Sequence, residues 1–257
     1  HTLGVNGGYS QADVTEFAKA LTGWSIAGLV NSRRAEPLPN GSAWAQNYHE
    51  QGTRKIMGVE YDQPDHRQSL AILDQLAKHP STAQHIATKL ARHFAGDEPP
   101  PAMIARLKDV FLKTDGDLPS LYRAIIDSPE AWAEQPLKFR TPWEWTIASL
   151  RATGVEANAL RRMPQALAQL GQPTWAAPSP QGFADTQAEW AAPDAILRRV
   201  ELAAQISRRA SVTDINALAR ELFPDSLNDQ TATWISRSAS PQQGLALLLA
   251  SPEMMRR

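Results

Sequence analysis

Residues 9–24 read YSQADVTEFAKALTGW, and this stretch has the pattern of a helix with a marked start and end. Ser10 is a favourable N-cap residue, because its hydroxyl oxygen accepts a hydrogen bond from a free backbone N–H of the first turn. Gly23 suits a helix end. Apolar side chains recur between them at the spacing of one helix face, at Val14, Phe17, Leu21 and Trp24. The stretch therefore predicts an amphipathic helix that buries one face.

Comparable patterns recur along the chain. Thr141 and Glu144 form a capping-box motif with proline at the first helical position, and Ser240 and Gln243 form a second one. Further helices are expected after Ser81 and Asp117 and at about 103–111, 156–170, 193–209, 212–222 and 227–238. We therefore expect a mainly α protein, built as a bundle-like array of many helices.

Two segments lack the helical pattern. Within the glycine-containing segment 25–66, Ala43–His49 and Arg54–Tyr61 flank a turn at Glu50–Thr53, which predicts a small β-hairpin near residues 43–61. The segment 171–192 is rich in proline and aromatic residues and is expected to be a long loop. We expect one helical domain over residues 1–257, with this loop as the place where it would divide into 1–170 and 193–257.

The composition excludes several classes of protein. The 257 residues carry a formal net charge of −1, which argues against binding nucleic acid through bulk charge. No apolar run approaches the ~20 residues that a membrane-spanning helix needs. The chain has no cysteine, so disulfides, thiol catalysis and cysteine-ligated metals are excluded. The absence of cysteine is compatible with both an oxidising periplasm and the cytosol.

Sequence motifs for common cofactors and nucleophiles are also absent. The chain lacks the phosphate-binding words GxxxxGK[ST] and GxGxxG and the nucleophile elbow GxSxG. None of its six histidines forms the HExxH pair of a zinc helix. We therefore expect no cofactor and no resident metal.

A group of polar residues lies in or beside the turns near the N-terminus. Its members include acids, bases and a cation, and they are the candidate catalytic residues His1, Tyr9, Asp13, His49, Glu50 and Lys55. Our hypothesis is that the hairpin around 49–55 folds over the start of the first helix and brings them together. The alternative is that Tyr9, Asp13 and Lys55 only fix a loop by hydrogen bonds.

Eight tryptophans are a high number for a chain of this length. Trp24, Trp143 and Trp234 fall on predicted helical stripes, so we expect them in the core. Trp44, Trp175 and Trp190 lie in irregular segments. These three are the candidates for a ligand-binding surface platform.

Five segments resemble a bacterial family known as domain of unknown function 1800 (DUF1800). They are HTLGVNGGYSQADVTEFAKALTGW at 1–24, NYHEQGTRKIMG at 47–58, LAKHPSTAQHIATKLARHF at 76–94, KFRTPWEWTIASLRATG at 138–154 and LLLASPEMMRR at 247–257. Glu50 stands where the family has aspartate. The resemblance implies that the chain is the C-terminal part of a longer protein with further helices upstream. It implies no activity, and it suggests a periplasmic or envelope location.

Three functions remain open. The first is a structural or protein-interaction module of the bacterial cell envelope, with a protein partner that includes the upstream half of the same protein. The second is a hydrolase of an envelope or extracellular polymer, which uses carboxylate and histidine chemistry near the N-terminal turn. The third is a metal-dependent enzyme with His1, His49 and either Asp13 or Glu50 as ligands. The absence of catalytic motifs favours the first.

Overall fold

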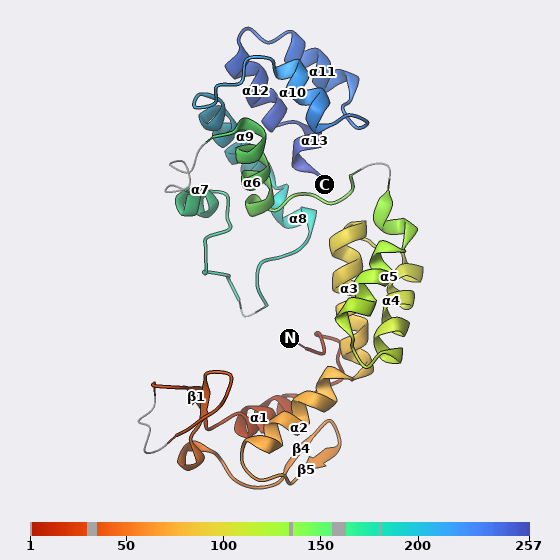
Figure 1. The fold of residues 1–257 in the computed structure, drawn as a ribbon, viewed down its shortest axis with the longest axis vertical. Helices are drawn as coiled ribbons and strands as arrows, with labels where there is room; N and C mark the ends of the chain where they lie inside the picture. Colours follow the sequence, from red (N-terminus) through yellow and green to blue (C-terminus); the bar gives the residue numbers. More distant parts are fainter. Residues whose placement is uncertain (1, 30–34, 134–135, 156–162, 180) are drawn as a thin grey trace. The chain divides into compact units, whose positions relative to one another are not determined.

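The structure is a computed structural model that describes residues 2–29, 35–133, 136–155, 163–179 and 181–257. In these residues the protein is mainly helical, as predicted, with two small antiparallel sheets (Figure 1). The chain divides into two compact units. One comprises His1–Lys89 and Ile104–Ala124, and the other comprises Leu90–Met103 and Ile125–Arg257. The segment 171–192 belongs to the second unit, and a division of the chain at that segment stays a prediction.

The first unit begins with helix α1 (Gln11–Ala20). The strands β1 (Trp24–Ile26), β2 (Glu36–Pro37) and β3 (Ser42–Trp44) follow, then a 3₁₀ turn η1 (Gln46–Tyr48) and the strands β4 (Arg54–Ile56) and β5 (Val59–Tyr61). Four helices come next: α2 (His66–Ala77), α3 (Pro80–Ala95), α4 (Pro101–Lys113) and α5 (Leu118–Ile126). The last three of these contribute residues to both units.

Helix α1 starts as the sequence predicts. The hydroxyl of Ser10 accepts a hydrogen bond from the backbone N–H of Asp13, and the Asp13 carboxylate accepts one from the backbone N–H of Ser10. This reciprocal pair satisfies two N–H groups that a helix start leaves free. Asp117 caps α5 without such a reciprocal bond: its carboxylate accepts from the N–H of Ser120 at 2.9 Å.

The β-hairpin lies within the predicted region, but its strands pair differently. Strand β4 pairs with β5 through a two-residue turn at Met57 and Gly58, whose φ angles are +49° and +83°. Two positive φ angles match the right-handed strand twist, and the glycine adopts one of them without strain. Strand β3 pairs instead with β1 and β2. The expected pairing of Ala43–His49 with Arg54–Tyr61 is therefore wrong.

The core of the first unit joins α1, the hairpin and α2. Its buried apolar side chains are Leu3, Ala20, Ile56, Tyr61, Ile72 and Leu76. Phe17 of the predicted α1 stripe packs against this cluster, whereas Val14 of the same stripe is 43% exposed. Only part of the stripe is therefore buried in the first unit.

The second unit is built from short helices. They are η2 (Pro129–Trp132), α6 (Pro142–Thr153), α7 (Met163–Gln169), α8 (Gln187–Trp190), α9 (Pro193–Ser207), α10 (Ile215–Leu222), α11 (Asp229–Ser236), α12 (Pro241–Leu249) and α13 (Pro252–Met255). Helices are found where they were predicted in this half, except that residues 156–162 of the predicted helix 156–170 lie outside the described residues. The short helix α8 was not predicted, because it lies in the segment 171–192 that was expected to be a loop. None of the described helices of either unit is long and apolar enough to cross a membrane.

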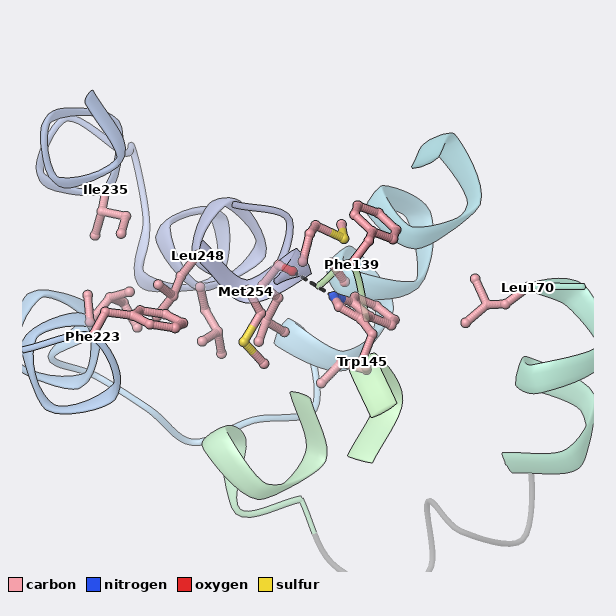
Figure 2. Packing of buried hydrophobic residues seen from close by; sticks show 14 of the residues in the cluster. Phe139, Trp145, Leu170, Phe223, Ile235, Leu248 and Met254 are labelled. Atoms are coloured by element: carbon pink, nitrogen blue, oxygen red, sulfur yellow. Dashed lines mark hydrogen bonds between the residues drawn. The ribbon is translucent and has the colours of Figure 1, made fainter. Parts of the chain in front are cut away.

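The core of the second unit surrounds Trp145, which is fully buried on α6 (Figure 2). Its indole N–H donates a hydrogen bond of 3.0 Å to the carbonyl oxygen of Leu249 at the end of α12. Phe139, Leu248 and Met254 are buried in the same cluster. The buried indole thus packs as an apolar group while its one polar atom is satisfied, as buried tryptophans require.

Residues 138–140 pair with the last residues of the chain. The N–H of Lys138 donates to the carbonyl of Arg257, the N–H of Arg257 donates back to Lys138, and Phe139 and Arg256 form the bridge between them. The N–H of Arg140 donates to the carbonyl of Met255 at 2.8 Å. This short ladder holds α13 beside the start of α6.

Two predictions of burial, one of a helical position and one of a helix start are wrong. Trp143 and Trp234 are 50% and 49% exposed. Trp24 lies in strand β1 and not on a helix, although it is partly buried against the Trp44 ring. On α6 the buried face carries Trp145, so Trp143 turns outward. Ser81 lies inside α3, which begins at Pro80. Periodicity fits several rotations of a short helix, and the neighbouring elements choose among them.

Candidate functional site

Asp13, a predicted catalytic residue, is occupied by structural hydrogen bonds. One carboxylate oxygen accepts from the N–H and hydroxyl of Ser10 at 2.7 and 2.6 Å, and the other accepts from the backbone N–H of Met57 at 2.6 Å. These bonds, from Ser10 first and Met57 second, lower the pKa of Asp13. The carboxylate therefore joins the β4–β5 turn to the start of α1, which matches the alternative of a loop fixed by hydrogen bonds.

Arg54 makes a second connection between the hairpin and α1, which no sequence pattern predicts. Its side chain is 7% exposed, and its Nη1 atom lies 3.4 Å from Oε2 of Glu16. Its Nη2 atom donates to the carbonyl oxygens of Glu50 and Gln51. The hairpin that packs against α1 is β4–β5, not the predicted one with its turn at 50–53, and its contacts are made by residues that hold the fold.

His49 and Glu50 are attached to the other end of α1. The Nδ1 atom of His49 lies 3.0 Å from the carbonyl oxygen of Thr22, and the backbone N–H of Glu50 donates to the Thr22 hydroxyl at 2.8 Å. Asp13 lies in the first turn of α1, whereas Thr22 directly follows the C-cap Leu21 at the other end of that helix. Asp13 and His49 are therefore not brought together.

The remaining members of the predicted cluster are at the surface or undescribed. Tyr9 is 38% exposed, and the side chain of Glu50 is 55% exposed. Lys55 is exposed and stands opposite Glu60 across the hairpin. His1 lies outside the described residues. Among the residues that the structure describes, no three histidine or carboxylate side chains come together as metal ligands.

Two of the three predicted platform tryptophans are buried. Trp44 and Trp190 are each 4% exposed, so the expectation that they form a surface platform is wrong. The Trp44 ring packs between three other rings, with centroid distances of 5.8 Å to Trp24, 4.8 Å to His49 and 5.6 Å to His66. Trp190 donates its N–H to the carbonyl of Ala184 at 3.0 Å. Both rings hold irregular segments against their own unit.

Trp175 is the exception, because its side chain is fully exposed. Its φ angle is +59°, an uncommon conformation for a residue with a bulky side chain. A ligand-binding role for Trp175 stays a prediction.

A groove of about 570 Å³ opens on the second unit, and its floor is apolar. It lies along α6 between that helix, the end of α10 and the last residues of the chain. We call the apolar lining residues its floor, because all of them are buried or partly buried: Ile147, Ala148, Ala152, Leu222, Phe223 and Met254. Its volume falls within the range of ligand-binding clefts in proteins, about 300–1,000 Å³.

The walls of the groove are mainly cationic. They consist of Arg140, Arg151 and Arg257 with one carboxylate, Glu144, and the half-exposed ring of Trp143. No motif in the sequence marks these residues as a group. The one available signal was that two of the five family-like segments, 138–154 and 247–257, both carry arginines, but only folding brings those segments together.

Glu144 is the centre of the charges in this groove. Its Oε1 atom lies 2.8 Å from Nε of Arg257, and its Oε2 atom accepts the backbone N–H of Thr141 at 2.9 Å. Arg140 donates to the carbonyl oxygen of Met254 at 2.8 Å. Burial lowers the pKa of Arg140, the charge of Arg257 lowers it further, and the charge of Glu144 opposes both.

Arg199 adds a buried cation next to this group. It is 1% exposed, its guanidinium lies 4.7 Å from the centre of the Phe139 ring, and it donates to the carbonyl oxygen of Arg140 at 2.8 Å. Burial lowers the pKa of Arg199 to about 10, and the charge of Glu144 opposes that shift. The single carboxylate of Glu144 thus lies near several arginines, and the groove has an excess of positive charge.

In the described part of the chain, the groove supplies cationic and apolar groups and a single carboxylate. A glycosidase-type site needs two carboxylates on opposite sides of the scissile bond, and the described lining of the groove contains only Glu144. It contains no serine, threonine, cysteine or histidine that would act as a nucleophile or base. What it offers is an apolar floor with guanidinium groups on its walls.

Comparison with known proteins identifies the family. A family model described as a protein of unknown function, DUF1800, matches residues 1–256. No curated protein and no solved structure is significantly similar to the chain. The match spans nearly the whole sequence, in agreement with the resemblance of its five segments, and the chain belongs to the DUF1800 family.

Proposed function

We propose that this protein is a protein-interaction module of the bacterial cell envelope and that it holds a segment of its partner in the groove along α6. The observation that carries the proposal is the combination of an apolar floor with cationic walls in one groove of the second unit. Apolar area removed from water supplies affinity, and charged walls select the partner.

Trp143 gives the groove a further property of protein-binding sites. Its ring is 50% exposed at the groove, and its backbone N–H donates to the side chain of Gln172 at 2.8 Å. Tryptophan and arginine are the residues most enriched among those that dominate binding energy at protein interfaces. The groove carries both.

The hydrolase alternative has less support. Asp13, the carboxylate on which it depended, has both oxygens occupied by hydrogen bonds within the fold. His49 is bonded to the far end of the same helix. The envelope location rests on the family resemblance, and the absence of cysteine is compatible with it.

The test is a selection of displayed peptides on the immobilised full chain, followed by binding measurements with single variants. Trp143→Ala removes a ring that lines the groove. Trp234→Ala is the matched control, because Trp234 lies on a helix of the same unit, is 49% exposed and does not line the groove. Both rings are half-exposed, so both variants should fold.

Peptides that bind the groove are expected to lose about tenfold or more in affinity for Trp143→Ala, which is about 1.4 kcal/mol. They should bind the Trp234→Ala variant as they bind the wild type. A second variant, Ala148→Trp, fills the floor of the groove and should abolish binding, whereas Ala168→Trp on the exposed side of α7 should not. Failure to select any peptide, or peptides that bind all four variants equally, would contradict the proposal.

A further inference from the structure

We infer that the segment held in the groove is an acidic amphipathic helix, with two carboxylates two turns apart and apolar side chains between them. This inference rests on the proposed function, since it names the chemistry of the partner at the same site. Three properties of the groove support it: its charge, the spacing of that charge, and the position of the apolar floor.

The charge calls for an anion. Three arginines and one glutamate line the groove, and the carboxylate of Glu144 is already engaged by Arg257 at 2.8 Å. Arg151 is exposed and has no ion-pair partner among the described residues. The buried guanidinium of Arg199 adds positive charge behind Glu144. An acidic partner would neutralise this excess, and a basic one would be repelled.

The spacing of the charge sets the distance between the partner's carboxylates. Arg257 and Arg140 lie at the Glu144 end of the groove, because Arg257 pairs with Glu144 and Arg140, four residues before Glu144, donates to the carbonyl of Met254. Arg151 follows Glu144 by seven residues on α6, which is two helical turns or about 10 Å along the axis. Two cationic ends are thus separated by about two turns of a helix.

The apolar floor lies between these two ends. Ile147 and Ala148 are three and four residues after Glu144, so they lie on the same face of α6 as Glu144 and Arg151. Phe223 complements them from the end of α10. A partner must therefore present its apolar side chains on the same side as its two acids.

A helix meets this requirement and an extended strand does not. In a helix, residues at i, i+3, i+4 and i+7 share one face, so acids at the outer positions and apolar residues at the inner ones point together. In a strand, residues that share a face are two or four positions apart, which is about 7 or 13 Å, so no same-face pair matches the roughly 10 Å between the two cationic ends. The groove therefore selects a helix that packs along α6 with acids at both ends of its contact face.

The probe is a fluorescein-labelled synthetic helix with two glutamates seven positions apart and two leucines between them. Two control peptides, called the glutamine twin and the lysine twin, have the same sequence with glutamine or lysine in place of both glutamates. Binding to the full chain is measured by fluorescence anisotropy. The acidic peptide is expected to bind about tenfold more tightly than its glutamine twin, and the lysine twin more weakly still. Because the attraction is electrostatic, the advantage should shrink between about 50 mM and about 500 mM salt.

Charge reversal at the far end of the groove tests the geometry. Arg151→Glu should lower the affinity for the acidic peptide about tenfold and raise the affinity for the lysine twin. Arg208→Glu, the same change at an exposed position that does not line the groove, should alter neither. Circular dichroism of both variants checks that the helices remain. Unchanged binding of the acidic peptide to Arg151→Glu would overturn the inference.

The outcomes separate this inference from the proposed function. If the acidic and glutamine peptides bind equally and Trp143→Ala weakens both, the groove binds a partner and the inferred charge is wrong. If no peptide of the set loses affinity for Trp143→Ala, neither the inference nor the proposed function stands. If the acidic preference holds and responds to Arg151 and Trp143, both are supported.

Discussion

The Nε atom of Arg257 lies 2.8 Å from Oε1 of Glu144, and this ion pair joins the last residue of the chain to the first turn of α6. The Nη1 atom of Arg257 also donates to the carbonyl oxygen of His93 at 3.2 Å. Three segments that resemble the DUF1800 family, 76–94, 138–154 and 247–257, therefore meet at one place in the second unit. Four predictions about the fold follow from contacts of this kind.

Glu144→Gln should destabilise the protein. The amide oxygen of glutamine can still accept the N–H of Thr141, but the negative charge that neutralises Arg257, and that acts on Arg140 and Arg199, is lost. We expect a loss of about 2 kcal/mol in the free energy of unfolding in urea, because a partly buried charge loses its partner. Glu201→Gln, an exposed control on α9, should change it by less than about 0.5 kcal/mol. Equal stability of the two variants would refute the role of Glu144.

Lys138→Met should destabilise the protein more than Glu144→Gln does. The ammonium group of Lys138 is 4% exposed and lies 2.8 Å from Asp97 and 3.1 Å from Asp185. Its removal leaves two neighbouring carboxylates without their cation, and we expect a loss of about 3–5 kcal/mol in the free energy of unfolding.

The control for Lys138 is Lys113→Met, which breaks an ion pair with Asp109 whose side chains are 72% and 58% exposed. That change should cost less than about 0.5 kcal/mol. Hydrogen exchange gives a local readout, since the N–H of Gln187 donates to the Asp97 carboxylate and should exchange faster in Lys138→Met. An unchanged exchange rate at Gln187 would show that the carboxylates are held by other contacts.

Asp13→Ala should weaken the joint between α1 and the hairpin in a pH-dependent way. Hydrogen bonds from Ser10 and Met57 hold the pKa of Asp13 in the folded chain below its ordinary value of 3.8. The stabilisation is therefore fully present above pH 3.8 and is lost as the pH falls through the lower pKa of the folded state.

Near neutral pH the free energy of unfolding of the wild type should be about 1–2 kcal/mol larger than that of Asp13→Ala, which is the usual contribution of a helix cap. Urea unfolding of both proteins at a series of pH values measures this difference. It should narrow only below pH 3.8, since the two proteins share every other carboxylate. A difference that stays constant down to the acid transition would mean that the charge of Asp13 contributes nothing.

Gly23→Ala should disturb the packing of the tryptophan rings. Gly23 has a φ angle of +92°, and a Cβ atom there would lie 3.0 Å from the Trp44 ring and 3.1 Å from Cβ of His49. Gly58→Ala is the matched control. Its φ is similar, +83°, and a Cβ atom there meets nothing within 4 Å in the described structure.

Both variants suffer the backbone strain of about 1–2 kcal/mol that a side chain brings to a left-handed conformation. The free energy of unfolding of Gly23→Ala should fall by about 1 kcal/mol more than that of Gly58→Ala, because the Trp44 ring must shift. Its near-ultraviolet circular dichroism should change as well, since that signal reports the packing of tryptophans. Equal stabilities together with identical spectra would show that Trp44 moves aside freely.

The local features of the fold were predictable because their causes lie within three or four residues. Ser10 and Thr141 cap their helices as expected, since each cap binds the backbone N–H three residues later. The pairing of the hairpin was not predictable from the same kind of pattern. Residues 54–61 form the β4–β5 hairpin through the turn at Gly58, and the strand that contains Trp44 pairs with β1 and β2 instead.

The candidate site shows the same limit. Asp13 and His49 were grouped because both are polar and lie near turns, yet α1 holds them at opposite ends. No sequence motif marks the residues that line the groove. Arg140 and Met254, whose side chain and carbonyl are hydrogen-bonded, are 114 residues apart, and no local pattern records such a contact.

The sequence by itself determined the mainly helical class, most of the helix starts and the family, because capping residues, apolar periodicity and family motifs each lie within short stretches of neighbouring residues. Tertiary structure alone decided which tryptophans are buried, which carboxylates are occupied by the fold and where positive charge accumulates. Those properties depend on which helix faces meet and on which distant groups share a desolvated space, and packing over the whole unit sets both.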